Sequence, residues 1–248
     1  MKSLTKYSGW IIAFALIFPC CFTLLYFVLL AGSPNGFQKS AYVIGKIIQF
    51  TLPIIWVGLV CHSEKSRECQ SPDVSREPWF RFLEGIIFGI LVFTAMFAIY
   101  WFYLRFPGCG LDKDSAARAM ILNKMTHLGI TDGRLFLLLG LFYSIIHSGL
   151  EEYYWRWFVF GQLRKQSENF LFAAIVSSLG FTLHHVVILG TYFGFDSPLC
   201  YLASFGVGVG GFYWAWLYHR SRSIRGTWIS HGIIDAAIFC IGYALCFA

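Results

Sequence analysis

The sequence predicts an all-α membrane protein, a polytopic bundle of about seven transmembrane helices with one further amphipathic helix at the membrane interface. Of its 248 residues, 57% are hydrophobic and 13% are charged, whereas a soluble domain has about 25% charged residues. Mean hydropathy is +0.63. The 26 Phe, 13 Tyr and 9 Trp suit a lipid-facing surface with interfacial aromatics. This composition excludes a soluble globule, a disordered chain and a disulfide-stapled secreted module.

Apolar stretches define the predicted spans, because a helix needs roughly 20 residues to cross the hydrocarbon core. They cover residues 8–31, 41–61, 84–104, 135–160, 171–190, 201–218 and 227–247. The first follows Lys2 and Lys6 as a signal peptide would. Its apolar run is too long and no A-x-A site follows, so we expect a retained helix. The segment 112–128 is amphipathic and too polar to span, and we expect it at the interface.

The distribution of Lys and Arg over the loops predicts a cytoplasmic N-terminus. With that orientation the inner side holds Lys2, Lys6, Lys65, Arg67, Arg76, Arg81, Arg164, Lys165, Arg220, Arg222 and Arg225. The outer side holds fewer, namely Lys39, Arg105, Lys113, Arg118, Lys124 and Arg134. Most of the outer residues belong to one long loop, whose charges count less.

The charge and cysteine patterns argue against nucleic-acid binding and against two common cysteine motifs. The net charge is +6, but the basic residues are spread over short loops without a run of five, so we expect no nucleic-acid binding. The 8 Cys include no C-x-x-C pair, which argues against a zinc ribbon or a thioredoxin-type motif.

Glycine spacing predicts close helix packing. The segment 206–211 formally matches G-x-G-x-x-G, but no strand precedes it and it lies inside an apolar span. Gly206 and Gly210 instead suggest a small-residue packing face, as do Gly85 and Gly89.

Ionisable residues at bilayer depth need a partner or a purpose, because each costs about 2.5–3.5 kcal/mol to insert. In span 135–160, Glu151 and Glu152 are adjacent carboxylates. Glu152 and Arg156 have the i,i+4 spacing and order of a favourable ion pair. Glu151 has no sequence-local cation, and His147 is its neighbour on the same face. One alternative is that Glu152 and Arg156 form a structural ion pair and that Glu151 has no function. The other is a desolvated carboxylate able to act as a general base.

Two further spans contain paired polar residues. In span 171–190, Phe181 and His185 share a helix face, and the 100° between adjacent residues leads us to expect His184 to face away from it. In span 227–247, His231 and Asp235 lie one turn apart beside the small residue Gly232. Each group could be purely structural. Together they could gather acid, base and donor groups in a low-dielectric pocket, as hydrolysis requires.

The ordered set of three motifs resembles a known family. Glu151-Glu152-xxx-Arg156, Phe181-xxx-His185 and His231-xxx-Asp235 are similar to the E-E-x-x-x-R, F-x-x-x-H and H-x-x-x-N/D motifs of the CPBP (CAAX protease and bacteriocin-processing, or Abi) intramembrane proteases. The resemblance covers roughly residues 140–240. It implies an endopeptidase that cleaves a membrane-associated peptide or protein near the cytoplasmic side.

The resemblance also implies roles for the site residues. Glu151 would activate water with His185 assisting, while His231 and Asp235 would stabilise the oxyanion. Glu152 and Arg156 would shape the site. An ionised Asp235 cannot donate to an oxyanion, so it would be protonated, orient His231 or bind a metal.

Cofactor, domain and functional alternatives remain open at this stage. Zn²⁺ is an alternative to a metal-free site, with Glu151, His185, His231 and Asp235 as candidate ligands. Residues 1–133 would form N-terminal membrane helices and loops, and 134–248 the catalytic bundle, within one membrane domain. The rival functions are a non-catalytic immunity or scaffold protein and a proton-coupled transporter. A transporter should show broken helices or inverted repeats, and the sequence shows neither.

Overall fold

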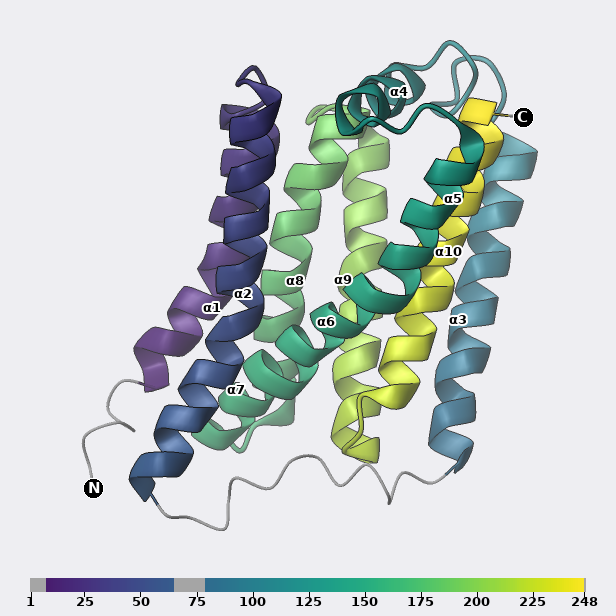
Figure 1. The fold of residues 1–248 in the computed structure, drawn as a ribbon. Helices are drawn as coiled ribbons and strands as arrows, with labels where there is room; N and C mark the ends of the chain where they lie inside the picture. The colour runs from purple at the N-terminus through teal and green to yellow at the C-terminus, as the bar shows by residue number, and fades with distance from the viewer. Residues whose placement is uncertain (1–7, 65–78, 248) are drawn as a thin grey trace.

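The computed structural model describes residues 8–64 and 79–247, and within these ranges every regular element is helical. Figure 1 shows long helices standing roughly side by side, with one short helix across their upper ends. Five of the basic residues used for the predicted orientation lie outside the described residues: Lys2, Lys6, Lys65, Arg67 and Arg76.

The N-terminal half supplies three long helices and one short one. They are α1 Ser8–Leu24 continued by the π-helical η2 Leu25–Leu29, α2 Asn35–Glu64, α3 Trp79–Ile99 continued by η5 Tyr100–Leu104, and α4 Ala116–Leu128. The α4 helix begins where the Ser115 side chain accepts a hydrogen bond from the Arg118 backbone and ends at Gly129, whose φ is 78°. It lies across the end of the bundle (Figure 1), as expected for an interfacial helix.

The C-terminal half contains one long composite helix and three simple ones. The composite helix comprises α5 Gly133–Phe142, η6 Tyr143–His147, α6 Ser148–Glu152, η7 Tyr153–Phe160 and α7 Gly161–Gln166. It is followed by α8 Phe170–Phe193, α9 Pro198–Ser221 and α10 Arg225–Phe247. All seven predicted apolar stretches are therefore helices, with ends shifted by a few residues.

Six helical segments of the described chain are long and apolar enough to cross a membrane: Ser8–Leu29, Gly36–Leu59, Trp79–Leu104, Gly133–Gln166, Phe170–Phe193 and Arg225–Phe247. The sequence predicted seven. The remaining one, α9, has 24 residues, but its glycines and its polar C-terminal turn lower its hydropathy. The chain is thus a multi-pass membrane protein.

The composite helix is strongly inclined. It contains 34 residues, which at 1.5 Å per residue is roughly 50 Å, well beyond a hydrocarbon core of about 30 Å. Figure 1 shows it crossing the bundle diagonally. Its middle is also the centre of the core, since Tyr154, Trp155 and Phe158 are at most 1% exposed. The hydroxyl of Tyr154 donates to the Ala15 carbonyl of α1 at 2.8 Å.

The predicted close helix packing is found at Gly85 but not at Gly206 and Gly210. A Cβ on Gly85 would lie 2.1 Å from the Gly226 carbonyl oxygen, so α3 and α10 touch backbone to backbone there. A Cβ on Gly206 would meet nothing within 4 Å, and one on Gly210 would meet only Trp214 of its own helix, at 3.7 Å. The prediction for Gly206 and Gly210 is wrong, because that face of α9 is not the one that packs on a neighbouring helix.

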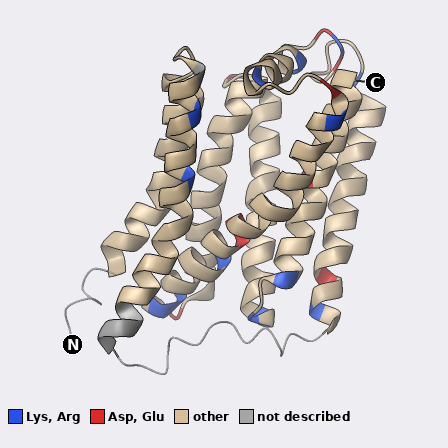
Figure 2. Cartoon of the chain, in the orientation of Figure 1, with Lys and Arg blue, Asp and Glu red and all other residues tan. Residues whose placement is uncertain are grey.

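Charged residues gather at the helix ends, and Figure 2 shows few within the bundle. At the lower end of α3, Glu84 pairs with Arg81 at 3.2 Å and with Arg220 of α9 at 3.4 Å. Exceptions are Lys46 of α2, Asp235 of α10 and the acidic residues in the middle of the composite helix. The acidic residues of the composite helix define the candidate site.

Candidate active site

Two adjacent carboxylates occupy the middle of the composite helix, between its two π-helical segments. Glu151 is 4% exposed and Glu152 is fully buried. A π-helical turn is uncommon and often marks a functional site. Buried carboxylates require hydrogen-bonding or charged partners, and the two residues have different ones.

Glu152 is held by a cation and an imidazole. Its Oε1 atom lies 2.9 Å from Nη1 of Arg156 and 2.9 Å from Nδ1 of His231. The guanidinium of Arg156 lies over the rings of Phe181 and Trp214, at 4.5 and 4.9 Å from their centroids. The predicted ion pair between Glu152 and Arg156 is thus formed, deep inside the bundle.

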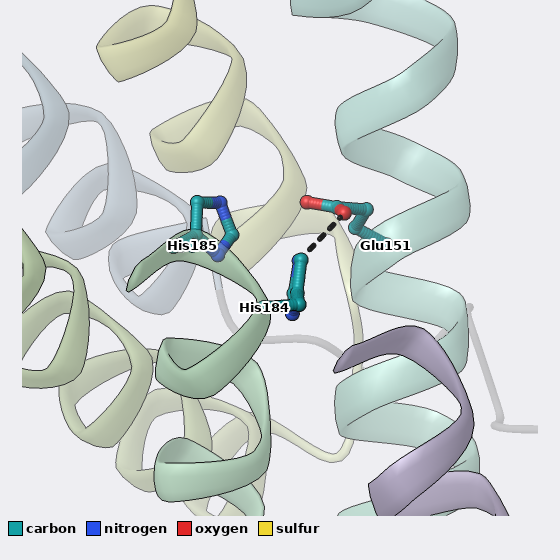
Figure 3. A group of neighbouring side chains, drawn as sticks. All are labelled: Glu151, His184 and His185. Atoms are coloured by element: carbon teal, nitrogen blue, oxygen red, sulfur yellow. Dashed lines mark ion pairs between the residues drawn. The ribbon is translucent and has the colours of Figure 1, made fainter. Parts of the chain in front are cut away.

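Glu151 is surrounded by imidazoles rather than by cations. Its Oε1 atom lies 3.4 Å from Nε2 of His147 and 3.5 Å from Nε2 of His184, and its Oε2 atom lies 3.8 Å from Nε2 of His231. Figure 3 shows the carboxylate of Glu151 above the ring of His184, with His185 beside it. No described Lys or Arg forms an ion pair with Glu151, which leaves it the less neutralised of the two carboxylates.

The expectation that His184 turns away from the site is wrong. Its ring is 3% exposed and stacks parallel to Trp155, with centroids 5.6 Å apart. Adjacent side chains do diverge by about 100° around their own helix. Glu151 nevertheless lies 3.5 Å from His184, and the ligand atom of His185 is within 4.8 Å of it.

His185 occupies the expected position beside Phe181. Its Nδ1 atom lies 2.8 Å from the Phe181 carbonyl oxygen, and the two ring centroids are 4.5 Å apart. A carbonyl only accepts, so Nδ1 has the proton and Nε2 of a neutral ring is left as an acceptor. Phe181 itself is 1% exposed and forms an apolar wall.

His231 lies among three carboxylates. Besides its contacts with Glu152 and Glu151, its Nε2 atom is 3.7 Å from Oδ1 of Asp235, one turn further along α10. Trp214 stacks on its ring at 4.4 Å. Asp235 is the most accessible of these groups, with 17% of its side chain exposed, and it therefore lies at the open edge of the site.

A close helix contact brings His231 to the carboxylates. A Cβ on Gly232 would lie 2.3 Å from the Ser144 carbonyl oxygen in η6. The indole Nε1 of Trp228, one turn earlier in α10, donates to the Ile145 carbonyl at 2.8 Å. The small residue noted beside His231 thus permits backbone contact between α10 and the composite helix.

Three ligand atoms could hold a metal ion. Glu151, His184 and His185 each offer one atom, and these lie within 4.8 Å of one another. Two imidazoles and one carboxylate are a donor set that zinc accepts in catalytic sites, and the bond from His185 to the Phe181 carbonyl is a typical support for such a ligand. The residues present therefore fit zinc. His231 and Asp235, the other candidates from the sequence, are outside this group.

Sequence reasoning missed three residues near the site. His184 was assigned to the wrong face, and His147 was noted only as a neighbour of Glu151. Lys46 of α2 was overlooked within an apolar span. Its Nζ atom lies 3.3 Å from Oε1 of Gln49 and 5.4 Å from the Phe50 ring centroid, and it interacts electrostatically with Glu151. A lone lysine in an apolar span is the signal that would have identified it.

One comparison with known proteins found a match to part of the chain. Residues 133–237 match the family model described as type II CAAX prenyl endopeptidase Rce1-like. No curated protein and no solved structure matches the chain. The matched segment runs from α5 into α10, and it contains all six residues selected from the sequence together with His147 and His184. The chain is therefore a multi-pass membrane protein whose segment 133–237 is similar to the Rce1-like family of type II CAAX prenyl endopeptidases.

Proposed function

We propose that the protein is an intramembrane endopeptidase in which Glu151 activates a water molecule to hydrolyse a peptide bond of a membrane-associated protein or peptide. The observation that supports this most directly is the environment of Glu151. It is a buried carboxylate with imidazole nitrogens at 3.4 and 3.5 Å and without an ion pair to a described Lys or Arg. A carboxylate without a direct ion pair to Lys or Arg retains more of the basicity that proton abstraction requires than one held by a guanidinium, as Glu152 is.

The neighbouring imidazoles supply the remaining steps. Glu151 takes a proton from water, and the hydroxide attacks the peptide carbonyl carbon. His185, with Nδ1–H donated to the Phe181 carbonyl, has its Nε2 lone pair available to accept a proton or to orient the water. The proton then passes to the leaving amine, which gives a new carboxyl end and a new amino end.

His231 is the candidate for stabilising the oxyanion. Its Nδ1 is engaged by Glu152, so only Nε2 is available to a substrate, and it donates when the ring is doubly protonated. Glu152 then pairs with the imidazolium. Asp235 at the open edge orients His231 rather than donating itself, since an ionised carboxylate only accepts.

Metal dependence is the alternative chemistry at the same residues. Glu151, His184 and His185 would hold Zn²⁺, which supplies a Lewis acid and a bound water of lowered pKa. We propose the metal-free form. Protein purified in detergent and dialysed against a strong chelator should keep its cleavage rate. Loss of activity that Zn²⁺ alone restores would contradict the metal-free form while leaving the peptidase function intact.

Cleavage of a membrane-anchored peptide tests the function. Purified protein in liposomes is given reporter peptides anchored by a prenylated cysteine or by an apolar helix, and the products are identified by mass spectrometry. We expect products with a new carboxyl end that contains one oxygen from labelled water. Intact peptide in every reaction, from protein with a normal unfolding transition, would favour the non-catalytic scaffold alternative.

The orientation with a cytoplasmic N-terminus is part of the proposal. Among the described residues, Arg81 lies in the first turn of α3, and Arg164, Lys165 and Arg220 lie in the last turns of α7 and α9. These helix ends are on the same side of the bundle as the start of α1 (Figure 1). Protease protection of a tag placed before Met1 in sealed vesicles checks this orientation.

A further inference from the structure

A small cavity that no residue of the candidate active site lines is found beneath the interfacial helix α4. Its volume is about 80 Å³, enough for several water molecules or one small polar group. Four elements meet around it: η2, α2, α4 and the end of α8. Its lining residues are Phe27, Ala31, Gln38, Met120, Asn123, Lys124, His127, Thr191 and Tyr192.

Lys124 is the cation of this cavity. Its Nζ atom lies 4.2 Å from the ring centroid of Tyr26 and 5.4 Å from that of Phe27. None of the described carboxylates forms an ion pair with it, and none lines the cavity. Burial lowers the pKa of Lys124, as expected of an ammonium group whose lost hydration no anion replaces.

The other polar groups around Lys124 suit an anion. Asn123 and His127 are exposed at the rim, and an amide or an imidazole can donate to anionic oxygens. Gln38 is buried and donates one amide hydrogen to the Tyr26 carbonyl at 3.1 Å, which fixes the floor of the cavity. A cation with neutral donors and no acid is the pattern of a site for a negatively charged group.

The position of the cavity indicates where that group comes from. It lies where α4 crosses the helix ends (Figure 1), the level at which lipid headgroups meet a membrane protein. Exposed apolar residues adjoin Phe27 in the sequence, with Val28 40% and Leu29 68% exposed. A phosphate in the cavity could therefore have acyl chains running along this apolar surface. A lysine between helix ends can hold a lipid phosphate there through charge-assisted hydrogen bonds.

We propose that the cavity beneath α4 binds the phosphate group of an anionic membrane phospholipid, with Lys124 as its cationic partner. The bound lipid joins α4 to α2 and α8. This site is separate from the peptidase chemistry and does not depend on it.

Lipid titration of the full-length protein in detergent tests the proposal. Dioleoyl phosphatidylglycerol is added in mixed micelles, and the unfolding temperature is followed against lipid concentration, since a ligand of the folded state raises that temperature. We expect a saturable rise for the unaltered protein. Lys124→Gln should need about tenfold more lipid for half the effect, the usual loss for one charge-assisted contact. Lys124→Arg, which keeps the positive charge, should bind the lipid about as well as the unaltered protein.

Matched controls and probes separate the other outcomes. Lys113→Gln removes the same charge from an exposed position in the neighbouring loop and should titrate like the unaltered protein. Equal titrations for Lys124→Gln and Lys113→Gln would overturn the proposal. A Lys124-dependent rise with inorganic phosphate at the same concentrations would overturn the lipid as the source. An equal rise with dioleoylglycerol, which has no phosphate, would overturn recognition of the phosphate.

Discussion

His231 and Glu152 are joined by a buried contact of 2.9 Å between Nδ1 and Oε1. The same oxygen lies 2.9 Å from Arg156, so Glu152 links α10 to the composite helix and is already neutralised. This contact separates the roles of the two adjacent carboxylates. We therefore propose that Glu152 holds the site together and that Glu151 is the carboxylate that acts in catalysis.

Replacing Arg156 should destabilise the protein. Arg156→Met would leave Glu152 as a buried carboxylate without its cation, at a cost of about 3–5 kcal/mol. Arg220→Met is a matched control, because Arg220 also pairs with a glutamate, but at 3.4 Å with both side chains about a third exposed. Such a pair contributes about 0–1 kcal/mol. Unfolding temperature and yield in detergent compare the two variants, and equal losses would contradict a special role for the buried pair.

The two glutamates should fail in different ways. Glu152→Gln should lower the unfolding temperature, because Arg156 and His231 lose their common anion. Glu151→Gln should leave that temperature nearly unchanged while cleavage is lost. The comparison needs both measurements on both variants. If both variants lose cleavage activity and both keep a normal unfolding temperature, the two glutamates do not have the different roles proposed here.

Both histidines of α8 should affect cleavage. His184 lies 3.5 Å from Glu151, and the ligand atom of His185 lies within 4.8 Å of it. His184→Ala should also cost stability because its ring stacks on Trp155. His219→Ala is the control, since that ring lies against Phe170 near the end of α9. Full cleavage activity in His184→Ala would show that this residue has a structural role only.

A methyl group at position 232 should disrupt the contact that brings His231 to the carboxylates. In Gly232→Ala the Cβ would lie 2.3 Å from the Ser144 carbonyl oxygen, and backbone atoms cannot yield as a flexible side chain can. Overpacking of this kind costs roughly 1–3 kcal/mol. Gly58→Ala, with nothing within 4 Å of the added atom, should be neutral. Thermal unfolding of both variants tests the expectation, and an unchanged Gly232→Ala would show that the helices separate easily.

Sequence reasoning predicted the helices well because apolar length is a local property. Every predicted apolar stretch is a helix, and Gly85 packs as its spacing suggested. The motif residues Glu151, Arg156 and His231 do come together. What the sequence could not supply was the direction from which one helix approaches another. That direction decided the environment of His184, and it also decided which glycines of α9 meet a neighbour. Lys46 was missed for a different reason, since a single charge barely changes the hydropathy of a long span.

The cleavage rate of Glu151→Gln, measured beside Glu84→Gln, tests the central claim most directly. Glu84 is a half-buried surface acid paired with Arg81 and Arg220, so its replacement controls for the loss of one carboxylate. We expect Glu84→Gln to cleave the membrane-anchored reporter at the normal rate. Glu151→Gln should be slower by at least 10²–10⁴-fold, the usual contribution of a general base, with an unchanged unfolding temperature. A Glu151→Gln protein that cleaves as fast as Glu84→Gln would contradict the assignment of Glu151 as the catalytic base.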